Sequence, residues 1–589
     1  GKRMRGVGWL VLLGIVQGAT GYGEYAKDDK VSVYVNKVGP YSNPYETYHY
    51  FSLPLCRPDK IVHHSLSLGQ VLDGDRMADS AFDIRFQKKQ PATSLCGMRS
   101  IEGDDLVRLV EAIEGDYYAE LIIDDIKTHH FIGYVDEANV FPHEHRVFLY
   151  THYVFEFEFN GFNIISVRIN ANRSSVVELE HDKSASFDIQ YSTIWTPTKQ
   201  PVSSRSSSSS SFFSSSRSSR VHWLSILNSL LLVTFLVAAV AVIIFSSVRR
   251  DLSRYNQLSD DDDLCLENGW KTIAGDVFRA PSYPMALSAI LGAGSQLLAL
   301  AAAVLVIGTT NAMNVHNHGL LSSLCVVLYA LTSGIAGYVS AYKYASLDGK
   351  RWIANINLSS LVFIVPVFAS WALNNTVAWI YHSTQALPWT TVVAIFALWG
   401  LVGYPLTVIG GLLGRAIRQR KAGSTAPFRT RTIPRELPLR TCGRSTPAQA
   451  MLGGLLPFCA ISVELSYIFS TIWGRETYTL FYVIFIVFSI LVVVVACTSI
   501  GLTYYQLNGE DYHWWWRSLL IGGSISAYIF VYGLLFLSHS TSMSGVLQLT
   551  QFFTHLGLLC YAAFLACGTI AHVAAATFVQ YIYTSVKSD

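Results

Sequence analysis

Charged residues are scarce in this chain of 589 residues. Asp, Glu, Lys and Arg together make up 14% of it and hydrophobic residues make up 51%, whereas soluble globular proteins carry about 25% charged residues. This composition excludes a disordered, collagen-like or coiled-coil chain and argues against an ordinary cytosolic enzyme. The formal net charge is only +2, without the clustered basic residues of a nucleic-acid binder. The sequence therefore predicts a chain that lies largely in lipid and binds no nucleic acid.

The motifs of the common enzyme classes are also missing. The sequence contains no Walker A loop, no HExxH or GxSxG motif and no kinase motif set. Histidines cluster at His63-His64, His129-His130 and His143-Glu144-His145, but the usual loop spacings of a structural zinc site are absent. We expect these histidines in loops or on sheet surfaces. The sequence thus predicts a protein that is not an enzyme and holds no metal or cofactor.

Cysteine is sparse, and its distribution is uneven. Of nine cysteines, only Cys56 and Cys96 precede the long apolar stretches of the chain. Two cysteines in one small domain of an oxidising compartment pair most simply with each other, so we predict a Cys56–Cys96 disulfide; the alternative is two free thiols. The other seven are expected to be thiols. In the same region, Asn172 begins the pattern Asn-Arg-Ser and is a candidate for N-glycosylation.

The first residues fit a secretory signal. Three basic residues within the first five precede an apolar run at 7–16 and small residues at 18–21. Ten apolar residues are too few to span about 30 Å of hydrocarbon. We therefore predict a signal peptide over residues 1–20; the alternative is a short buried strand or helix. The residues that follow would enter the secretory lumen.

Residues 21–200 carry the patterns of β-strands. Apolar runs lie on both sides of Asn160-Gly161, over residues 147–169, and the first of them alternates apolar and polar residues. Two such runs around Asn-Gly predict a hairpin. Residues 117–123 and 82–86 are further strand candidates. We predict a luminal all-β domain, an antiparallel sandwich, over residues 21–200.

The second half of the chain is apolar. A serine-rich segment at 201–222 cannot bury enough apolar surface to fold alone, and we interpret it as a flexible tether. From residue 223 to 580 the chain contains nine stretches long enough to cross a bilayer as helices. They cover about 224–247, 285–309, 320–342, 353–374, 389–413, 450–471, 479–505, 518–538 and 551–576.

Basic residues alternate sharply between the loops of these nine spans. With the N-terminal domain in the lumen, the loops and the tail on the cytosolic side hold 19 Lys and Arg residues, and the luminal loops between spans hold one, Arg475. Positive residues favour the cytosolic side of a membrane protein. The bias predicts a luminal N-terminus and a cytosolic C-terminus. It also supports the count of nine, since one span more or fewer would scramble the alternation.

Three features of the spans need an explanation. Glu464 is the one acidic residue at membrane depth, where a carboxylate costs several kcal/mol unless it is protonated, paired or hydrated. It is either a functional residue or a protonated Glu that shares a hydrogen bond with a neighbouring helix. Small residues recur in several spans, and we interpret them as sites of close helix packing rather than as a groove for other helices. The run at 512–517, Tyr-His-Trp-Trp-Trp-Arg, is typical of an interfacial anchor.

Several longer motifs resemble those of one family. They are VGPYSNPYETYHYFSLPLC at 38–56, Gly74-Asp75-Arg76, VHWLSILN at 221–228, Gly-Trp-Lys and Gly-Asp-Val-Phe-Arg within 269–279, LTSGIAGY at 331–338, Gly349-Lys350-Arg351-Trp352 and GEDYHWWWR at 509–517. In order and length they are similar to the signatures of the nonaspanins, the transmembrane 9 superfamily, also called endomembrane proteins. The compact luminal region resembles the shorter-domain branch. The serine tract departs from the family pattern, which puts the role of the tether in doubt.

The resemblance implies residence in Golgi and endosome membranes and a role in sorting, escort or surface delivery of other membrane proteins. It also implies a C-terminal signal that the COPI coat reads, here Lys587 and Asp589 in a cytosolic tail at 581–589. The expected partners are COPI coat subunits, client membrane proteins and the lipid bilayer. The alternative function is an ion, proton or small-solute transporter or channel that uses Glu464.

Overall fold

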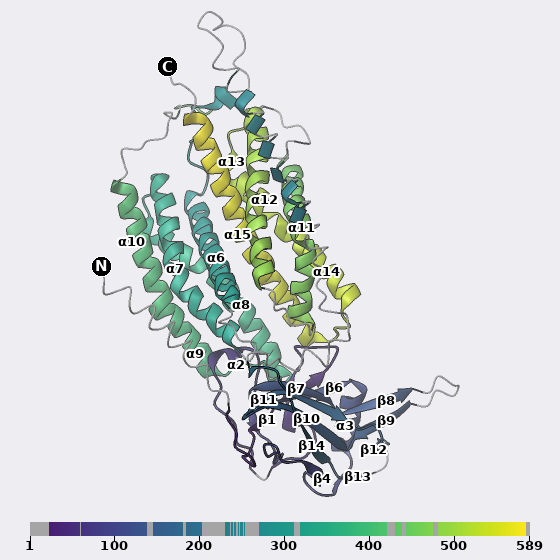
Figure 1. Cartoon of the computed structure of the whole chain (residues 1–589). Helices are drawn as coiled ribbons and strands as arrows, with labels where there is room; N and C mark the ends of the chain where they lie inside the picture. Colours follow the sequence, from purple (N-terminus) through teal and green to yellow (C-terminus); the bar gives the residue numbers. More distant parts are fainter. Residues whose placement is uncertain are drawn as a thin grey trace, which may run out of the picture.

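The computed structural model describes residues 23–58, 60–137, 145–180, 184–202, 270–310, 319–420, 432–438, 445–474 and 481–584, together with 430, 443 and scattered positions between 230 and 253. An N-terminal β domain lies at one end of a bundle of long helices (Figure 1). The predicted signal peptide, most of the predicted tether and the last five residues fall outside the described residues.

Eight helices of the described chain are long and apolar enough to cross a membrane. They are α6 (Pro284–Thr309), α7 (Leu320–Ser346), α8 (Trp352–Ile380), α9 (Trp389–Leu398) continued by the π-helix η5 (Trp399–Gly403) and α10 (Tyr404–Arg420), α11 (Thr446–Trp473), α12 (Phe481–Asn508), α13 (Trp514–Gly523) followed by α14 (Ile525–Ser540), and α15 (Val546–Thr584). They correspond one to one to the second through ninth predicted spans. The first, 224–247, lies mostly outside the described residues, although the positions described between 230 and 253 are helical.

The helices run farther than the apolar stretches of the sequence. α7 takes in Lys343, α10 ends with Arg415, Arg418 and Arg420, and Arg517 lies inside α13. Hydropathy marks only the part of a helix at hydrocarbon depth, whereas its backbone hydrogen bonds continue into the polar layer. α15 is the extreme case: its 39 residues measure about 58 Å, against about 30 Å of hydrocarbon.

Glycines of the bundle lie where two helix backbones meet. A Cβ atom at Gly410 would collide with the backbone oxygen of Gly334, and one at Gly414 with that of Tyr338, so α7 and α10 pack backbone to backbone. Between α6 and α15, a Cβ atom at Gly294 would collide with the backbone of Leu565. These contacts confirm the prediction of close helix packing at small residues.

Within the described residues, the β domain contains four sheets. Their strand orders are β2-β1-β6-β7 with β3 also paired to β1, β11-β10-β14-β4, β12-β9-β8, and β13-β5. The strands are β1 (Val33–Pro40), β2 (Tyr48–His49), β3 (Ala78–Asp79), β4 (Gln90–Ser94), β5 (Arg99–Ile101), β6 (Tyr117–Ile123), β7 (Ile126–Phe131), β8 (Gly133–Glu137), β9 (His145–Tyr150), β10 (His152–Asn160), β11 (Asn163–Ala171), β12 (Val176–Leu179), β13 (Ala185–Phe187) and β14 (Gln190–Pro197). A 3-10 turn, η1 (Tyr50–Ser52), and the helices α2 (Leu68–Leu72) and α3 (Asp104–Glu114) connect them.

The hairpin predicted around Asn160-Gly161 is present. β10 and β11 pair antiparallel with Phe157 opposite Val167. Gly161 adopts a φ of 62°, in the left-handed region that glycine tolerates. Phe157 is buried in the core while its neighbour Glu156 lines the outer face, as strand alternation requires. The strand predicted at 117–123 is β6.

Three details depart from the antiparallel all-β prediction. β10 and β14 pair in parallel, with His152 opposite Gln190, because the chain passes through β12 and β13 before it returns to this sheet. α3 is an amphipathic helix whose buried residues recur every three or four positions, a helical period inside a strand-rich region. Residues 82–86 alternate in burial but form only an isolated bridge, between Lys30 and Arg85, so the strand predicted there is wrong. The domain is β-rich rather than all-β.

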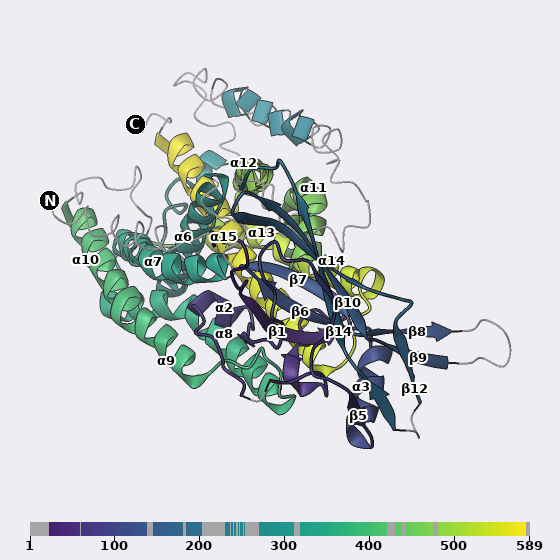
Figure 2. The same ribbon diagram turned by 60° about the horizontal axis from the view of Figure 1, so that its bottom comes forward.

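The β domain covers one end of the bundle unevenly. Seen from the domain side, α9 and α10 form one edge of the bundle and α14 lies toward the opposite edge (Figure 2). The domain contacts the start of α7, the connection between α8 and α9, the end of α11 and the start of α15. These connections supply one side of the site described next.

Candidate functional site at the junction of the β domain and the bundle

The loop between β1 and β2 reaches into the helix bundle. The Tyr45 hydroxyl donates to the carbonyl oxygen of Ile472 at 2.7 Å, and the Tyr45 backbone N–H donates to Oε1 of Gln548 at 3.2 Å. The Tyr45 ring stacks on His555, with ring centroids 5.7 Å apart. One residue of the β domain thereby joins α11 to α15.

The same loop binds two connections between helices. The Thr47 carbonyl oxygen accepts from the backbone N–H of Thr384 and from the Ser383 hydroxyl, both at 2.9 Å. The hydroxyl oxygens of Thr47 and Thr384 lie 2.6 Å apart. Asn43 Oδ1 accepts from the backbone N–H of Ser544, just before α15, at 3.1 Å. Buried hydrogen bonds of this kind fix the orientation of the two partners, because breaking one leaves a polar group unsatisfied.

A second loop, between α2 and β3, makes the remaining contacts. Asp73 accepts from the Ser322 hydroxyl of α7 at 2.7 Å, and Arg76 Nη2 donates to the carbonyl oxygen of Ala386 at 2.7 Å. α2 itself packs so closely on the start of α7 that a Cβ atom at Gly69 would collide with its backbone. The two loops together hold the β domain on the bundle at several separate points.

A cluster of charges lies buried behind the second loop. Asp75 is fully buried, and its carboxylate accepts from Lys37 Nζ at 2.9 Å and from Lys127 Nζ at 3.2 Å. The Asn36 side-chain amide bridges Asp75 and Glu120, at 2.9 and 2.6 Å. Glu120 also lies 3.5 Å from Lys127. The cluster therefore pairs two carboxylates with two ammonium groups.

The lysines decide the ionisation of the two acids. Burial alone would raise the pKa of Asp75, but Lys37 and Lys127 outweigh it and hold that pKa below its usual value. Burial acts the same way on Glu120, but the same lysines and a hydrogen bond with His129 bring its pKa well below the usual value. Both carboxylates stay charged, and a buried charge of this kind depends on its partners.

The junction is not evident from sequence patterns alone, although one signal is present. Lys37 lies in β1 and Glu120 in β6, both strands whose residues are almost all buried. A charge on a strand that is covered on both faces requires a buried partner. Two such interruptions in apolar strands predict a buried ion-pair cluster, though not where it lies.

Motif residues also gather at the opposite end of the bundle. A short 3-10 helix, η4 (Trp270–Ile273), begins a segment that lies against α13 and α15. Trp514 Nε1 donates to the carbonyl oxygen of Val277 at 3.0 Å, and the Tyr583 hydroxyl donates to that of Trp270 at 2.6 Å. Trp270, Trp514 and Tyr583 are each 1% exposed. The interpretation of 512–517 as an interfacial anchor is wrong for Trp514, because protein encloses it.

A buried ion pair holds α13 at this end. Arg517 Nη1 lies 3.0 Å from Asp511 Oδ2, and the Arg517 guanidinium also donates to the Thr446 hydroxyl of α11, at 3.2 and 3.1 Å. Arg517 and Asp511 are 5% and 7% exposed. The ion pair and the aromatic cluster together join α11, α13 and α15.

The predicted site residues are scattered through the fold. Cys56 and Cys96 form a disulfide, with Cα atoms 5.8 Å apart, and the cysteines described in the helices are free thiols. Asn172 lies partly exposed in the turn after β11, where its Oδ1 accepts from the backbone N–H and the hydroxyl of Ser174 at 3.1 and 2.7 Å. Glycosylation of Asn172 stays a prediction.

The other predicted sites concern the bundle and the tail. Glu464 lies in α11 and is 5% exposed, so its side chain faces protein and not lipid. Its protonation state stays a prediction. Lys587 and Asp589 lie outside the described residues. Among the predicted site residues that the structure describes, it brings together only the two cysteines.

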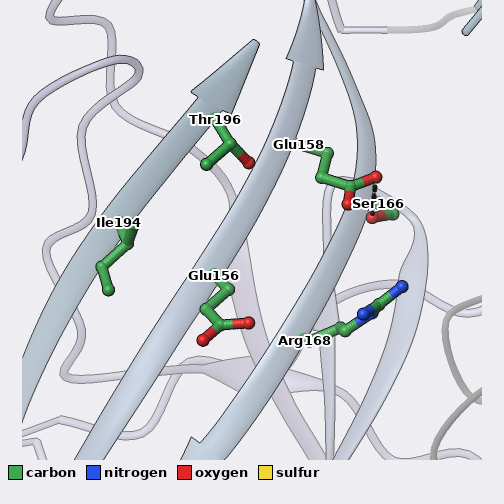
Figure 3. A pocket seen from close by; sticks show the side chains of 6 residues that line it. All are labelled: Glu156, Glu158, Ser166, Arg168, Ile194 and Thr196. Atoms are coloured by element: carbon green, nitrogen blue, oxygen red, sulfur yellow. Dashed lines mark hydrogen bonds between the residues drawn. The ribbon is translucent and has the colours of Figure 1, made fainter. Parts of the chain in front are cut away.

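The outer face of the second sheet holds a polar pocket of about 320 Å³ (Figure 3). It is lined by Glu156, Glu158, Ser166, Arg168, Ile194 and Thr196. Glu158 accepts from the Ser166 hydroxyl at 3.0 Å. In the part of the chain that the structure describes, no group of three His, Cys, Asp or Glu side chains is placed to hold a metal ion. The pocket is a polar sheet face that carries no recognisable catalytic arrangement.

Comparison with known proteins identifies the family of this chain. The family model described as endomembrane protein 70 matches residues 47–546. The chain belongs to the endomembrane protein 70 family. "Transmembrane 9 superfamily member 1" of Bos taurus is 45% identical to it, over 98% of this chain and 97% of the relative. "Transmembrane 9 superfamily member 4" of Arabidopsis thaliana and "Putative phagocytic receptor 1b" of Dictyostelium discoideum are each 38% identical, over 96% of this chain and 95% of the relative. No solved structure matches the chain.

The endomembrane protein 70 match includes most of the contacts at both ends. At the junction it covers Thr47 and the loop that carries Asp75; at the other end it covers Trp270 and Arg517. The resemblance that the sequence motifs indicate is therefore confirmed. The structure adds that the motifs at 38–56 and Gly74-Asp75-Arg76 contact the bundle, and that the motif at 509–517 joins helices at the other end.

Proposed function

We propose that this chain resides in Golgi and endosome membranes, where it sorts or escorts other membrane proteins without catalysing a reaction. Its β domain would face the lumen and its tail the cytosol. The observation that carries the proposal is the fixed attachment of the β domain to the bundle, through Tyr45, Thr47, Asp73 and Arg76. A domain held in one orientation beside the membrane can contact the luminal part of a client while the helices contact its span.

Family membership supports the same function. The Dictyostelium discoideum relative carries the name "Putative phagocytic receptor 1b", which suits a protein that acts on or near the cell surface. Transferred to this chain, that role requires traffic between the cell surface and internal membranes. A protein that escorts clients on such a route must return after each delivery.

A recycling signal at Lys587 and Asp589 would supply the return. α15 ends at Thr584, and the preceding Tyr583 is bonded to Trp270. Five residues of sequence follow, which reach about 17 Å when extended. A coat subunit lying against the membrane would then bind Lys587 as a point cation and Asp589 as an anion.

Affinity purification from native membranes tests the escort function. We expect the full chain to co-isolate a reproducible set of other membrane proteins, and Lys587→Ser to shift the chain from the Golgi toward later compartments. Ser588→Ala, which changes the middle residue of the same signal, is the matched control and should leave localisation unchanged. Unchanged localisation and coat binding in Lys587→Ser would sink the recycling signal. The absence of any co-isolated membrane protein would sink the escort function itself.

A transporter or channel is the second candidate, and the burial of Glu464 inside α11 favours keeping it. A carboxylate that faces protein at membrane depth can belong to an ion or proton path. Flux through proteoliposomes that is lost in Glu464→Gln would support transport. Client co-isolation that survives the same substitution would support escort.

A further inference from the structure

The ends of α8 and α10 that lie away from the β domain form one basic surface. Four of its residues are Lys350 and Arg351, just before α8, and Arg415 and Arg418, in the last turns of α10. Lys350 and Arg351 are exposed, and the two α10 arginines are partly exposed. None of the four forms an ion pair with a carboxylate of the described chain. The nearest acidic residue in sequence is the exposed Asp348.

Two contacts place these two helix ends side by side. The Arg415 guanidinium lies over the Trp352 ring, 4.7 Å from its centroid. One turn deeper, a Cβ atom at Gly411 would collide with the Ile356 side chain. We call this line of contact between α8 and α10 the seam. It places Trp352, and the basic residues that precede α8, beside the end of α10. Arg418 follows Arg415 by three residues, so both lie on the same face of α10.

The level of this surface in the membrane follows from helix length. The span from Trp389 to Arg420 is one helix of 32 residues. With the exposed Trp389 at one hydrocarbon boundary, Arg415 lies about 39 Å along the helix, roughly 9 Å beyond a core of about 30 Å. That is the depth of lipid headgroups. Arg418 lies farther out, at the membrane surface.

Helix electrostatics explains only part of the pattern. Arginines in the last turns of α10 suit the negative end of a helix dipole, but Lys350 and Arg351 stand at the positive end of α8, where a cation is unfavourable. Within the part of the chain that the structure describes, no carboxylate neutralises these four cations. A phosphate group at headgroup depth would satisfy all four, and arginine binds phosphate through paired hydrogen bonds.

We infer that the seam between α8 and α10 binds an anionic phospholipid, with its phosphate among Lys350, Arg351, Arg415 and Arg418 and its chains along the lipid-facing side of the seam. Farther into the bilayer, the Tyr404 hydroxyl donates to Asn357 Oδ1 at 3.0 Å, which continues the same seam. The inference does not depend on the proposed escort function. If it is correct, the lipid composition of the leaflet opposite the β domain affects how α8 and α10 pack at this end of the bundle.

Lipid binding by the purified full-length protein tests the site. The probe is a fluorescent phosphatidylinositol phosphate in micelles of a neutral detergent, titrated against the wild type, Arg415→Gln/Arg418→Gln and the control Arg249→Gln/Arg250→Gln. The control removes two exposed arginines next to Val248, which packs in the aromatic cluster at the same end of the bundle. One basic residue near an anionic surface contributes about 1 kcal/mol to binding. Loss of two such residues should therefore weaken binding roughly thirtyfold in Arg415→Gln/Arg418→Gln. We expect the control pair to weaken it less than threefold.

A second pair of variants separates lost charge from lost fold. Arg415→Lys/Arg418→Lys keeps both charges and should retain part of the binding, because lysine holds phosphate as a point charge. Equal weakening by the glutamine pair and the control pair would overturn the site, since only total charge would then matter. Lysine variants that bind as weakly as the glutamine variants would overturn it too. So would equal binding of a phosphatidylcholine probe with the same chains.

Discussion

The two ends of the helix bundle are fastened by different chemistry. At the junction with the β domain, Tyr45, Thr47 and Arg76 bond to backbone carbonyls, N–H groups and hydroxyls of helix connections. At the opposite end, Trp270, Trp514 and Tyr583 pack in an apolar cluster beside one buried ion pair, Arg517–Asp511. The junction joins two units that each have a core of their own, and polar contacts suit surfaces that are hydrated before they meet. The far end joins parts of one bundle, where large aromatic side chains exclude water from the start.

The largest expected effect comes from a substitution in the buried charge cluster of the β domain, beside the junction. Asp75→Ala leaves Lys37 and Lys127 buried without their shared acceptor, and we expect a loss of about 3–5 kcal/mol in the stability of the β domain. Asp83→Ala is the control, because its ion pair with Arg85 is about half exposed and should contribute at most about 1 kcal/mol. Both losses can be measured by heating the full chain in detergent and monitoring unfolding of the β domain by its susceptibility to proteolysis. Equal losses would mean that the buried cluster does not stabilise the β domain.

The matching change at the far end is Arg517→Met. It leaves Asp511 buried without its main partner and removes two hydrogen bonds to Thr446, so we expect a loss of about 3 kcal/mol. Arg435→Met, which breaks a more exposed pair with Glu510, should lose at most about 1 kcal/mol. Hydrogen exchange should rise in α13 and not in the β domain. Faster exchange in the β domain would contradict the separation of the two ends.

A smaller effect depends on pH and arises in the β domain. Burial lowers the pKa of His130 to about 3, whereas an unfolded histidine titrates near 6.5. Below about pH 6.5 the unfolded chain binds a proton that the folded chain does not, so stability falls as the pH falls, by about 2 kcal/mol at pH 5.

Unfolding temperatures measured between pH 7.5 and pH 5 check this slope. His130→Phe should flatten it, whereas His63→Phe, at an exposed position, should leave it unchanged. Identical slopes in the wild type and His130→Phe would refute the role of His130. Below about pH 4 a further loss is expected, because the lowered pKa values of Asp75 and Glu120 make their stabilisation disappear as each becomes protonated.

The smallest effects come from two single hydroxyl groups. Tyr45→Phe and Tyr583→Phe each remove one hydrogen bond to a backbone carbonyl, and each should cost about 1 kcal/mol. Hydrogen exchange should then increase near Ile472 in the first variant and near Trp270 in the second. A change at the far end in Tyr45→Phe would show that the two ends are coupled more tightly than their contacts indicate.

Patterns with a fixed period could be predicted from the sequence. Hydropathy located eight described spans within a few residues at most ends, and Asn160-Gly161 located the hairpin of β10 and β11. Pairings between distant residues could not be located, because no local period encodes them. Tyr45 and Ile472 are 427 residues apart, and the parallel register of β10 and β14 depends on where an intervening chain returns. Trp514 resembled an anchor because its sequence neighbours are basic and aromatic, whereas its burial depends on distant residues such as Val277, to which it is hydrogen-bonded, and His572, on which it stacks.

α15 connects the two ends of the bundle. It is one unbroken rod whose first turn carries Gln548, bonded to Tyr45, and whose last turn carries Tyr583, bonded to Trp270. A rod of about 58 Å acts as a lever: a tilt of about 5° at the β domain would move the opposite end by about 5 Å. That displacement is about as large as the pitch of an α-helix, and it would break the hydrogen bond between Tyr583 and Trp270. α15 is therefore the element through which a large displacement of the β domain would reach the opposite end of the bundle.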